Sequence, residues 1–67
     1  MSFESTQVYI SLVGACSHLL GSSRALARQL GISHATIARR VSNPTTIKRE
    51  HLYALELLHE RLRPKGY

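Results

Sequence analysis

Gly31 is the residue that most constrains the fold, because it separates two short segments in which apolar residues recur every three or four positions. That spacing predicts one helix over residues 23–30 and a second over residues 34–42. Ser33 can cap the second helix, and glycine readily adopts the positive φ needed at the end of the first. Two short helices joined by a glycine-containing turn form a helix-turn-helix motif. The apolar side chains expected to hold this motif together are Leu26, Ala27, Leu30, Ile32, Ile37 and Val41.

Helical periodicity continues on both sides of the motif. A helix is expected over residues 5–20 and should end at Gly21, although alternating apolar residues within 6–13 leave an N-terminal strand open. After a turn at residues 43–46, a last helix is expected over residues 47–63. The expected core positions are Val8, Leu12, Ala15, Cys16 and Leu19 in the first of these helices and Leu52, Leu55, Leu58 and Leu62 in the last.

The length of 67 residues allows one domain with a small hydrophobic core. We therefore expect residues 1–67 to form a single all-α domain of four or five helices around a helix-turn-helix core at 23–42. No stretch approaches the ~20 apolar residues of a membrane helix, and the first residues lack the pattern of a signal peptide. Cys16 is the only cysteine, which fits a reducing compartment. Dimerisation is expected to assist stability.

The charge balance restricts the function classes. Nine lysines and arginines stand against four acidic residues, all glutamate, for a formal net charge of +5. This excess indicates a polyanionic partner, most simply nucleic acid. The carboxylate clusters of magnesium-dependent phosphoryl transfer are missing, so no enzyme is expected. The histidines lack paired spacing and one cysteine cannot complete a zinc site, so neither a metal nor a cofactor is expected. These histidines are His18, His34, His51 and His59.

The segment RALARQLGISHATIARRV, residues 24–41, resembles the DNA-binding core of lambda-repressor-like (Cro and phage-repressor type) helix-turn-helix proteins. The resemblance is specific over residues 23–42 and looser over residues 15–62. Arg40 departs from it, because the family often has a large apolar or aromatic residue there. Either the Arg40 stem covers the edge of the core, or the second motif helix sits differently. The resemblance implies that this second helix enters the DNA major groove.

Candidate DNA contacts follow from this placement. Arg39 is a long side chain among small ones, and its guanidinium suits guanine O6 and N7. The expected base contacts are His34, Ala35, Ala38 and Arg39. Hydroxyls, helix N-termini and nearby basic side chains are expected to contact phosphates. The expected phosphate contacts are Ser22, Ser23, Arg24, Arg28, Ser33, Thr36, Arg40, Ser42, Asn43, Thr45, Thr46, Lys48 and Arg49.

Tyr53 and Leu57 lie one turn apart on the last expected helix, on the side that faces away from its expected core leucines. We expect them to form a two-fold dimer contact, with the N-terminal segment around Ile10 as the rival interface.

The expected function is a cytoplasmic transcription regulator that acts in a bacterium or a phage-infected host. The expected regulator is a repressor that binds an inverted-repeat operator as a homodimer and blocks a nearby promoter, including its own. The resemblance implies that it is encoded by a phage or a mobile element. One alternative is a non-specific or architectural DNA binder, which would bind random and operator DNA equally. Another is a protein-interaction module, such as an antitoxin or an inhibitor-like adaptor, which the basic turn around Lys48 and Arg49 argues against.

Overall fold

A computed structural model describes residues 2–63 of the chain as four α-helices and one short 3-10 helix. These elements are α1 (Phe3–Leu20), α2 (Ser23–Leu30), α3 (His34–Ser42), η1 (Pro44–Thr46) and α4 (Arg49–Leu62). The described part contains no strand, so the all-α, four-helix prediction is confirmed and the alternative of an N-terminal strand is wrong. Within it, no helix has the length and apolar character needed to cross a membrane.

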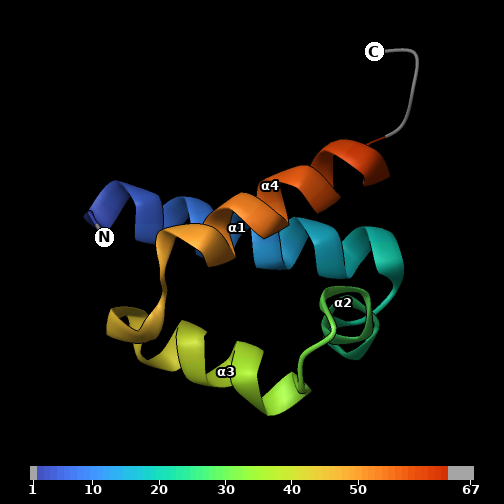
Figure 1. Cartoon of the computed structure of the whole chain (residues 1–67). Coiled ribbons are helices and arrows are strands. Elements are labelled where there is room, and N and C mark those ends of the chain that lie inside the picture. Colours follow the sequence, from blue (N-terminus) through green and yellow to red (C-terminus); the bar gives the residue numbers. More distant parts are fainter. Residues whose placement is uncertain (1, 64–67) are drawn as a thin grey trace.

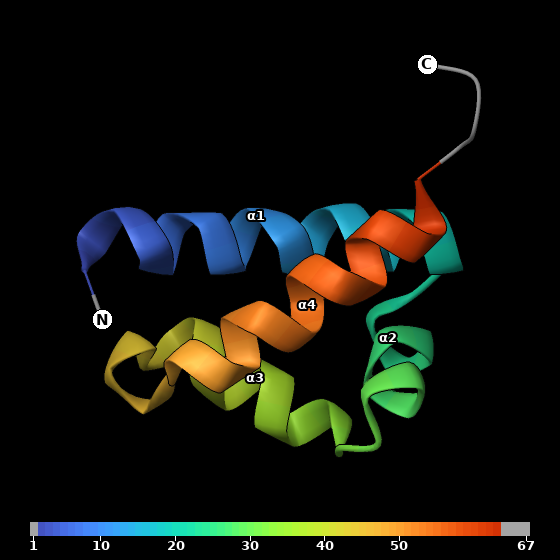
Figure 2. The ribbon, with the colours of Figure 1, turned by 45° about the horizontal axis from the view of Figure 1, so that its top comes forward.

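The helices form two pairs. Figure 1 shows α1 and α4 together on one side of the molecule and α2 and α3 on the other. The turned view in Figure 2 shows α4 running obliquely from the end of α3 toward the C-terminal end of α1. The most extensive helix contacts join α1 to α4 and α1 to α2, whereas α3 packs mainly against α2 and η1.

Local capping explains where the two motif helices begin and end. The Ser22 hydroxyl accepts the Ala25 N–H at 3.1 Å at the start of α2. After α2, Gly31 has φ 72° and donates its N–H to the Arg28 carbonyl. Ile32 donates to the Ala27 carbonyl, which completes a Schellman motif. A helix ending in a positive-φ glycine turns the chain sharply into α3.

The core lies where α1, α2, α3 and α4 meet. Its buried hydrophobic side chains are Tyr9, Val13, Cys16, Leu26, Ala27, Ile37, Ile47 and Leu55. The predicted leucine stripe of α4 is confirmed, because Leu55 is fully buried and Leu52, Leu58 and Leu62 pack against the core. The helix begins at Arg49, two residues later than expected, because Ile47 is in an extended conformation with its side chain buried.

The predicted core face of α1 is right in part, because Cys16 is buried and Leu12 packs against the core. Val8 and Leu19 are 45% and 41% exposed, whereas Tyr9 is fully buried and Leu20 packs against the core. The buried face is therefore rotated toward Tyr9, Val13 and Leu20 but still includes Cys16. The rotation follows from packing, because α1 contacts both α2 and α4 and therefore buries the side between them. The helix also starts at Phe3 instead of Ser5, with the Ser2 hydroxyl as its cap.

The prediction for the inner face of α3 is half right. Ile37 is buried, but Val41 is 37% exposed and does not form the expected buried pair with it. Arg40 points inward instead, and its guanidinium donates a part-buried hydrogen bond of 3.4 Å to the Tyr9 hydroxyl. This contact attaches the last turn of α3 to α1.

Candidate nucleic-acid interface

The outer face of α3 consists of short side chains and one long cationic side chain. Ala35, Ala38, Arg39 and Ser42 are all exposed, on the side of the helix opposite the buried Ile37. Small side chains permit a helix backbone to approach base edges, and a single arginine among them has room to reach a base. Three of the sequence-predicted base contacts, Ala35, Ala38 and Arg39, therefore share one accessible surface.

The N-terminal ends of α2 and α3 are joined by a side-chain hydrogen bond. Ser23 Oγ lies 2.7 Å from His34 Nε2, and each residue is the first of its helix. Both were predicted as DNA contacts, one for a phosphate and one for a base, but their mutual contact was not predicted. Because Nε2 is engaged with the hydroxyl, Nδ1 is the ring nitrogen that His34 presents to a ligand.

Two further hydroxyls among the predicted phosphate contacts cap helices. Ser22 caps α2, and Ser33 Oγ accepts the Thr36 N–H at 3.2 Å at the start of α3. The Thr36 hydroxyl lies 2.8 Å from the same Ser33 oxygen. These groups hold the first turns of both motif helices, so any phosphate they contact meets a preformed helix end.

The residues after α3 form a compact turn of polar side chains. Thr45 donates to the Asn43 side-chain oxygen at 2.7 Å, and Thr46 donates to the Asn43 carbonyl at 2.8 Å. Asn43 and Thr45 are exposed next to Ser42, at the C-terminal end of α3. The turn therefore places several hydroxyl and amide groups beside the outer face of α3.

Exposed arginines surround this surface without acidic partners. Arg24, Arg28 and Arg39 are exposed, and no carboxylate in residues 2–63 lies within 4.0 Å of their guanidinium groups. Their positive charge is therefore available to a polyanion. Arg40 differs, because its half-buried side chain is directed toward Tyr9.

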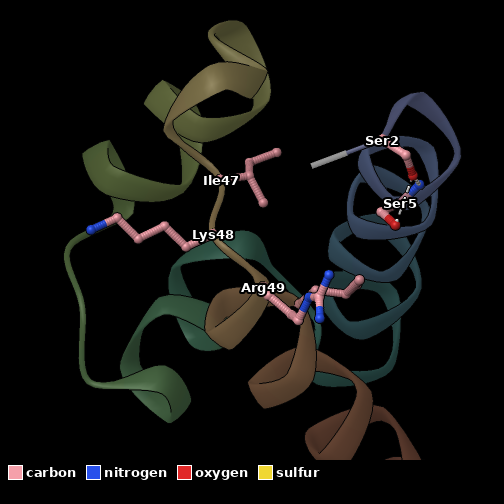
Figure 3. A pocket seen from close by; sticks show the side chains of 6 residues that line it. Ser2, Ser5, Ile47, Lys48 and Arg49 are labelled. Carbon is pink, nitrogen blue, oxygen red and sulfur yellow. Dashed lines mark hydrogen bonds between the residues drawn. The ribbon is translucent and has the colours of Figure 1, made fainter.

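Lys48 and Arg49 diverge although they are neighbours in the sequence. Figure 3 shows Arg49 directed toward the N-terminal end of α1 and Lys48 directed away from it. Both residues nevertheless line one hollow of about 460 Å³, which is also lined by Ser2, Ser5, Ile47 and Leu52. The two side chains point in different directions, so each requires its own test.

Tyr53 and Leu57 are exposed on the outer side of α4, at 62% and 49%. A mainly apolar hollow of about 410 Å³ lies beside Tyr53 and is also lined by Leu52 and Glu56. The predicted dimer residues therefore lie together on an accessible surface, which the single chain leaves uncovered.

The described residues contain no group of three histidine, cysteine or acidic side chains placed to hold a metal ion. Cys16 is buried in the core, and burial raises the pKa of its thiol. The role that this position supports is packing of a small apolar side chain.

Two short capped helices joined at Gly31, with a small-residue face on the second, define a helix-turn-helix domain. The comparison with protein families agrees, since a family model described as a helix-turn-helix domain matches residues 11–43. The match spans the second half of α1, α2 and α3. It supports the helix-turn-helix fold without distinguishing the lambda-repressor type. Searches of curated proteins and of solved structures each found no match.

Proposed function

We propose that this protein is a sequence-specific double-stranded-DNA-binding transcription regulator, a repressor of the lambda-repressor-like type. The observation that carries the proposal is the outer face of α3, where Arg39 stands among Ala35, Ala38 and Ser42. A helix with such a face fits the major groove, which presents a distinct donor and acceptor pattern for each base pair. The proposal assigns binding to this chain and no catalysis.

Each predicted base contact has a defined partner in this proposal. Arg39 donates two hydrogen bonds to guanine O6 and N7, and the Ala35 methyl contacts a thymine methyl. Ala38 lets the helix backbone approach the bases. His34, held by Ser23 at 2.7 Å, donates from Nδ1 to a purine edge or a phosphate oxygen.

Phosphate contacts are proposed on both sides of α3. Ser22, Ser23, Arg24 and Arg28 approach the backbone from α2, and Ser33 and Thr36 approach it from the start of α3. On the other side the proposed contacts are Ser42, Asn43, Thr45, Thr46, Lys48 and Arg49. Arg40 is retained in the set, although its hydrogen bond to Tyr9 supports a structural role first.

The active form is proposed to be a homodimer whose contact includes Tyr53 and Leu57. Burial of their exposed surfaces against a second copy would pair identical faces across a two-fold axis. An operator with inverted half-sites about 34 Å apart follows from such symmetry. Leu57→Glu should convert the dimer to a monomer in sedimentation analysis, and an unchanged mass for this variant would remove α4 from the interface.

Repression is proposed to result from occupation of a promoter, including the protein's own, so that polymerase is excluded. The setting is the cytoplasm of a bacterium or of a phage-infected host. Protein concentration or a partner protein is proposed to set the occupancy.

In vitro selection from a pool of random duplex DNA, at physiological salt, tests the proposal. A palindromic consensus is the expected result, and its half-site spacing would report the dimer geometry. Binding without enrichment, lost steeply as salt rises, would instead indicate a non-specific or architectural binder. No binding at low salt would favour a protein-interaction module, for which the accessible Tyr53 surface is the first candidate.

A further inference from the structure

The first turn of α4 is capped in a different way from those of the other helices. Serine hydroxyls cap α1, α2 and α3, whereas α4 begins after Lys48, whose ammonium group cannot accept a hydrogen bond. The Lys48 backbone N–H donates instead to His51 Nδ1 at 3.0 Å. The His51 backbone N–H donates a hydrogen bond of 2.9 Å to the Lys48 carbonyl in return. An imidazole nitrogen accepts a hydrogen bond only while it carries no proton, so this cap depends on protonation.

His51 also lies at the junction of three elements. Its side chain is 21% exposed and lines a cavity of about 240 Å³ between α2, α3 and α4. The remaining lining residues are Leu30, Ile32, Arg40, Glu50 and Ala54. Arg40 is the cationic group that faces His51 from α3, and through its bond to Tyr9 it connects the same cavity to α1.

The charged groups around the imidazole oppose a further positive charge. Arg40 contributes a positive charge from α3, Lys48 contributes one from the start of α4, and the α2 side offers only apolar Leu30 and Ile32. Glu50 favours the protonated imidazole because its carboxylate is negative. That carboxylate is, however, 4.0 Å from Nε2 and largely exposed. Burial is the main reason that the pKa of His51 lies below its usual value of 6.5, and Arg40 and Lys48 lower it further.

We propose that His51 is an acid-sensitive cap that couples the packing of α3 and α4 to pH. Protonation of Nδ1 replaces the acceptor for the Lys48 N–H with a second donor and places a cation beside Arg40. It also adds positive charge at the N-terminal end of α4, where the helix dipole disfavours it. The first turn of α4 then loosens, and α3 loses a support on its inner side.

The direction of the pH effect follows from the lowered pKa. As the pH falls below 6.5, the unfolded chain takes up the His51 proton before the folded chain does. The stability that the neutral imidazole contributes is complete above this value. This contribution declines as the pH falls below 6.5, until His51 is protonated in the folded chain as well.

Thermal unfolding at about pH 7.5 and about pH 5 tests the cap, with the wild type compared with His51→Gln. Glutamine at this third helical position can accept the Lys48 N–H at either pH. The melting temperature of His51→Gln should therefore fall less on acidification than that of the wild type. The expected difference between the two proteins is about 4 °C or more. His18→Gln is the matched control, because His18 is exposed on α1, and it should keep the wild-type pH dependence. Equal pH dependence of the wild type and His51→Gln would overturn the proposal.

NMR of the wild-type protein gives a second test that requires no variant. The Lys48 amide proton should shift as His51 titrates and should lose its hydrogen-bonded chemical shift in acid. A Lys48 amide that does not respond while the His51 ring titrates would also overturn the proposal.

The expected effect of pH on DNA binding rests on the proposed function, whereas the melting and NMR tests do not. If the protein binds a selected DNA site, acidification should weaken binding more for the wild type than for His51→Gln. Identical pH profiles of DNA binding would contradict the coupling to α3. If neither protein bound DNA at any pH, the proposed function would fail, and the melting and NMR results would still decide whether the cap is acid-sensitive.

Discussion

The α2–α3 unit and the α1–α4 pair differ in charge and in burial. Helices α2 and α3 together carry four arginines and no acidic residue, whereas α1 and α4 carry all four glutamates of the chain and only two arginines. The short pair buries only Leu26, Ala27 and Ile37, whereas α1 alone buries four side chains. One pair therefore presents a basic polar surface, and the other carries the acidic residues and four of the eight buried hydrophobic side chains.

This difference shows how so small a chain can reserve a surface for a ligand. Helices of eight and nine residues are too short to persist in water without tertiary packing. The long α1 helix provides that packing for α2, and α3 packs in turn against α2 and η1. The outer face of α3 can then consist of alanine, serine and arginine, because stability does not depend on those side chains.

The largest expected effect is in the supporting pair. Leu55 is fully buried in α4, so Leu55→Ala should destabilise the protein by about 2–5 kcal/mol through lost burial and a cavity. In a 67-residue domain this loss is a large fraction of the total stability, so the folded population should fall and DNA binding should weaken with it. Chemical denaturation measured by circular dichroism checks the prediction. Glu56→Ala, an exposed neighbour, should change the stability little, and a comparable loss for both variants would contradict the assigned core.

A smaller effect is expected at the cap of α3. The Ser33 hydroxyl accepts the Thr36 N–H at 3.2 Å, so Ser33→Ala should lower the unfolding free energy by about 1 kcal/mol. Thermal unfolding provides the measurement. Ser11→Ala is the matched control, because Ser11 is exposed inside α1 and alanine is the better helix former there. If the two variants were equally stable, the Ser33 bond would not contribute to folding.

The smallest expected effect is a gain in stability at Gly14. This glycine is exposed inside α1, its φ is not positive, and an added Cβ would meet no atom within 4 Å. Gly14→Ala should therefore stabilise the protein by about 0.5–1 kcal/mol, which denaturant titration can resolve. A loss of stability that depends on protein concentration would show that a second copy packs closely on α1, which would favour the N-terminal rival interface over Tyr53 and Leu57.

Local rules explain why the motif could be predicted from the sequence. The bounds of α2 and α3 agree with the prediction to the residue, because serine caps and the positive-φ glycine act within a few positions of the chain. The same locality explains the leucine stripe of α4, where one side of the helix faces the core.

Contacts between distant residues explain what could not be predicted. The buried face of α1 is set by two neighbouring helices at once, so periodicity alone selected Val8 where Tyr9 is buried. The inward position of Arg40 depends on the Tyr9 hydroxyl, 31 residues away in the chain. The bond between Ser23 and His34 likewise joins residues 11 positions apart, and no spacing rule indicates it.

The central claim is that the outer face of α3 reads bases through Arg39, and one comparison tests it most directly. Selection from random duplex DNA would be run in parallel with the wild type, Arg39→Ala and the phosphate-contact variant Lys48→Ala. The account predicts that Arg39→Ala loses the preference for guanine at one position of each half-site and keeps the remaining consensus. Lys48→Ala should keep the whole consensus and bind more weakly to every sequence, with a shallower salt dependence. An unchanged consensus for Arg39→Ala, with only a uniform loss of affinity, would contradict the claim.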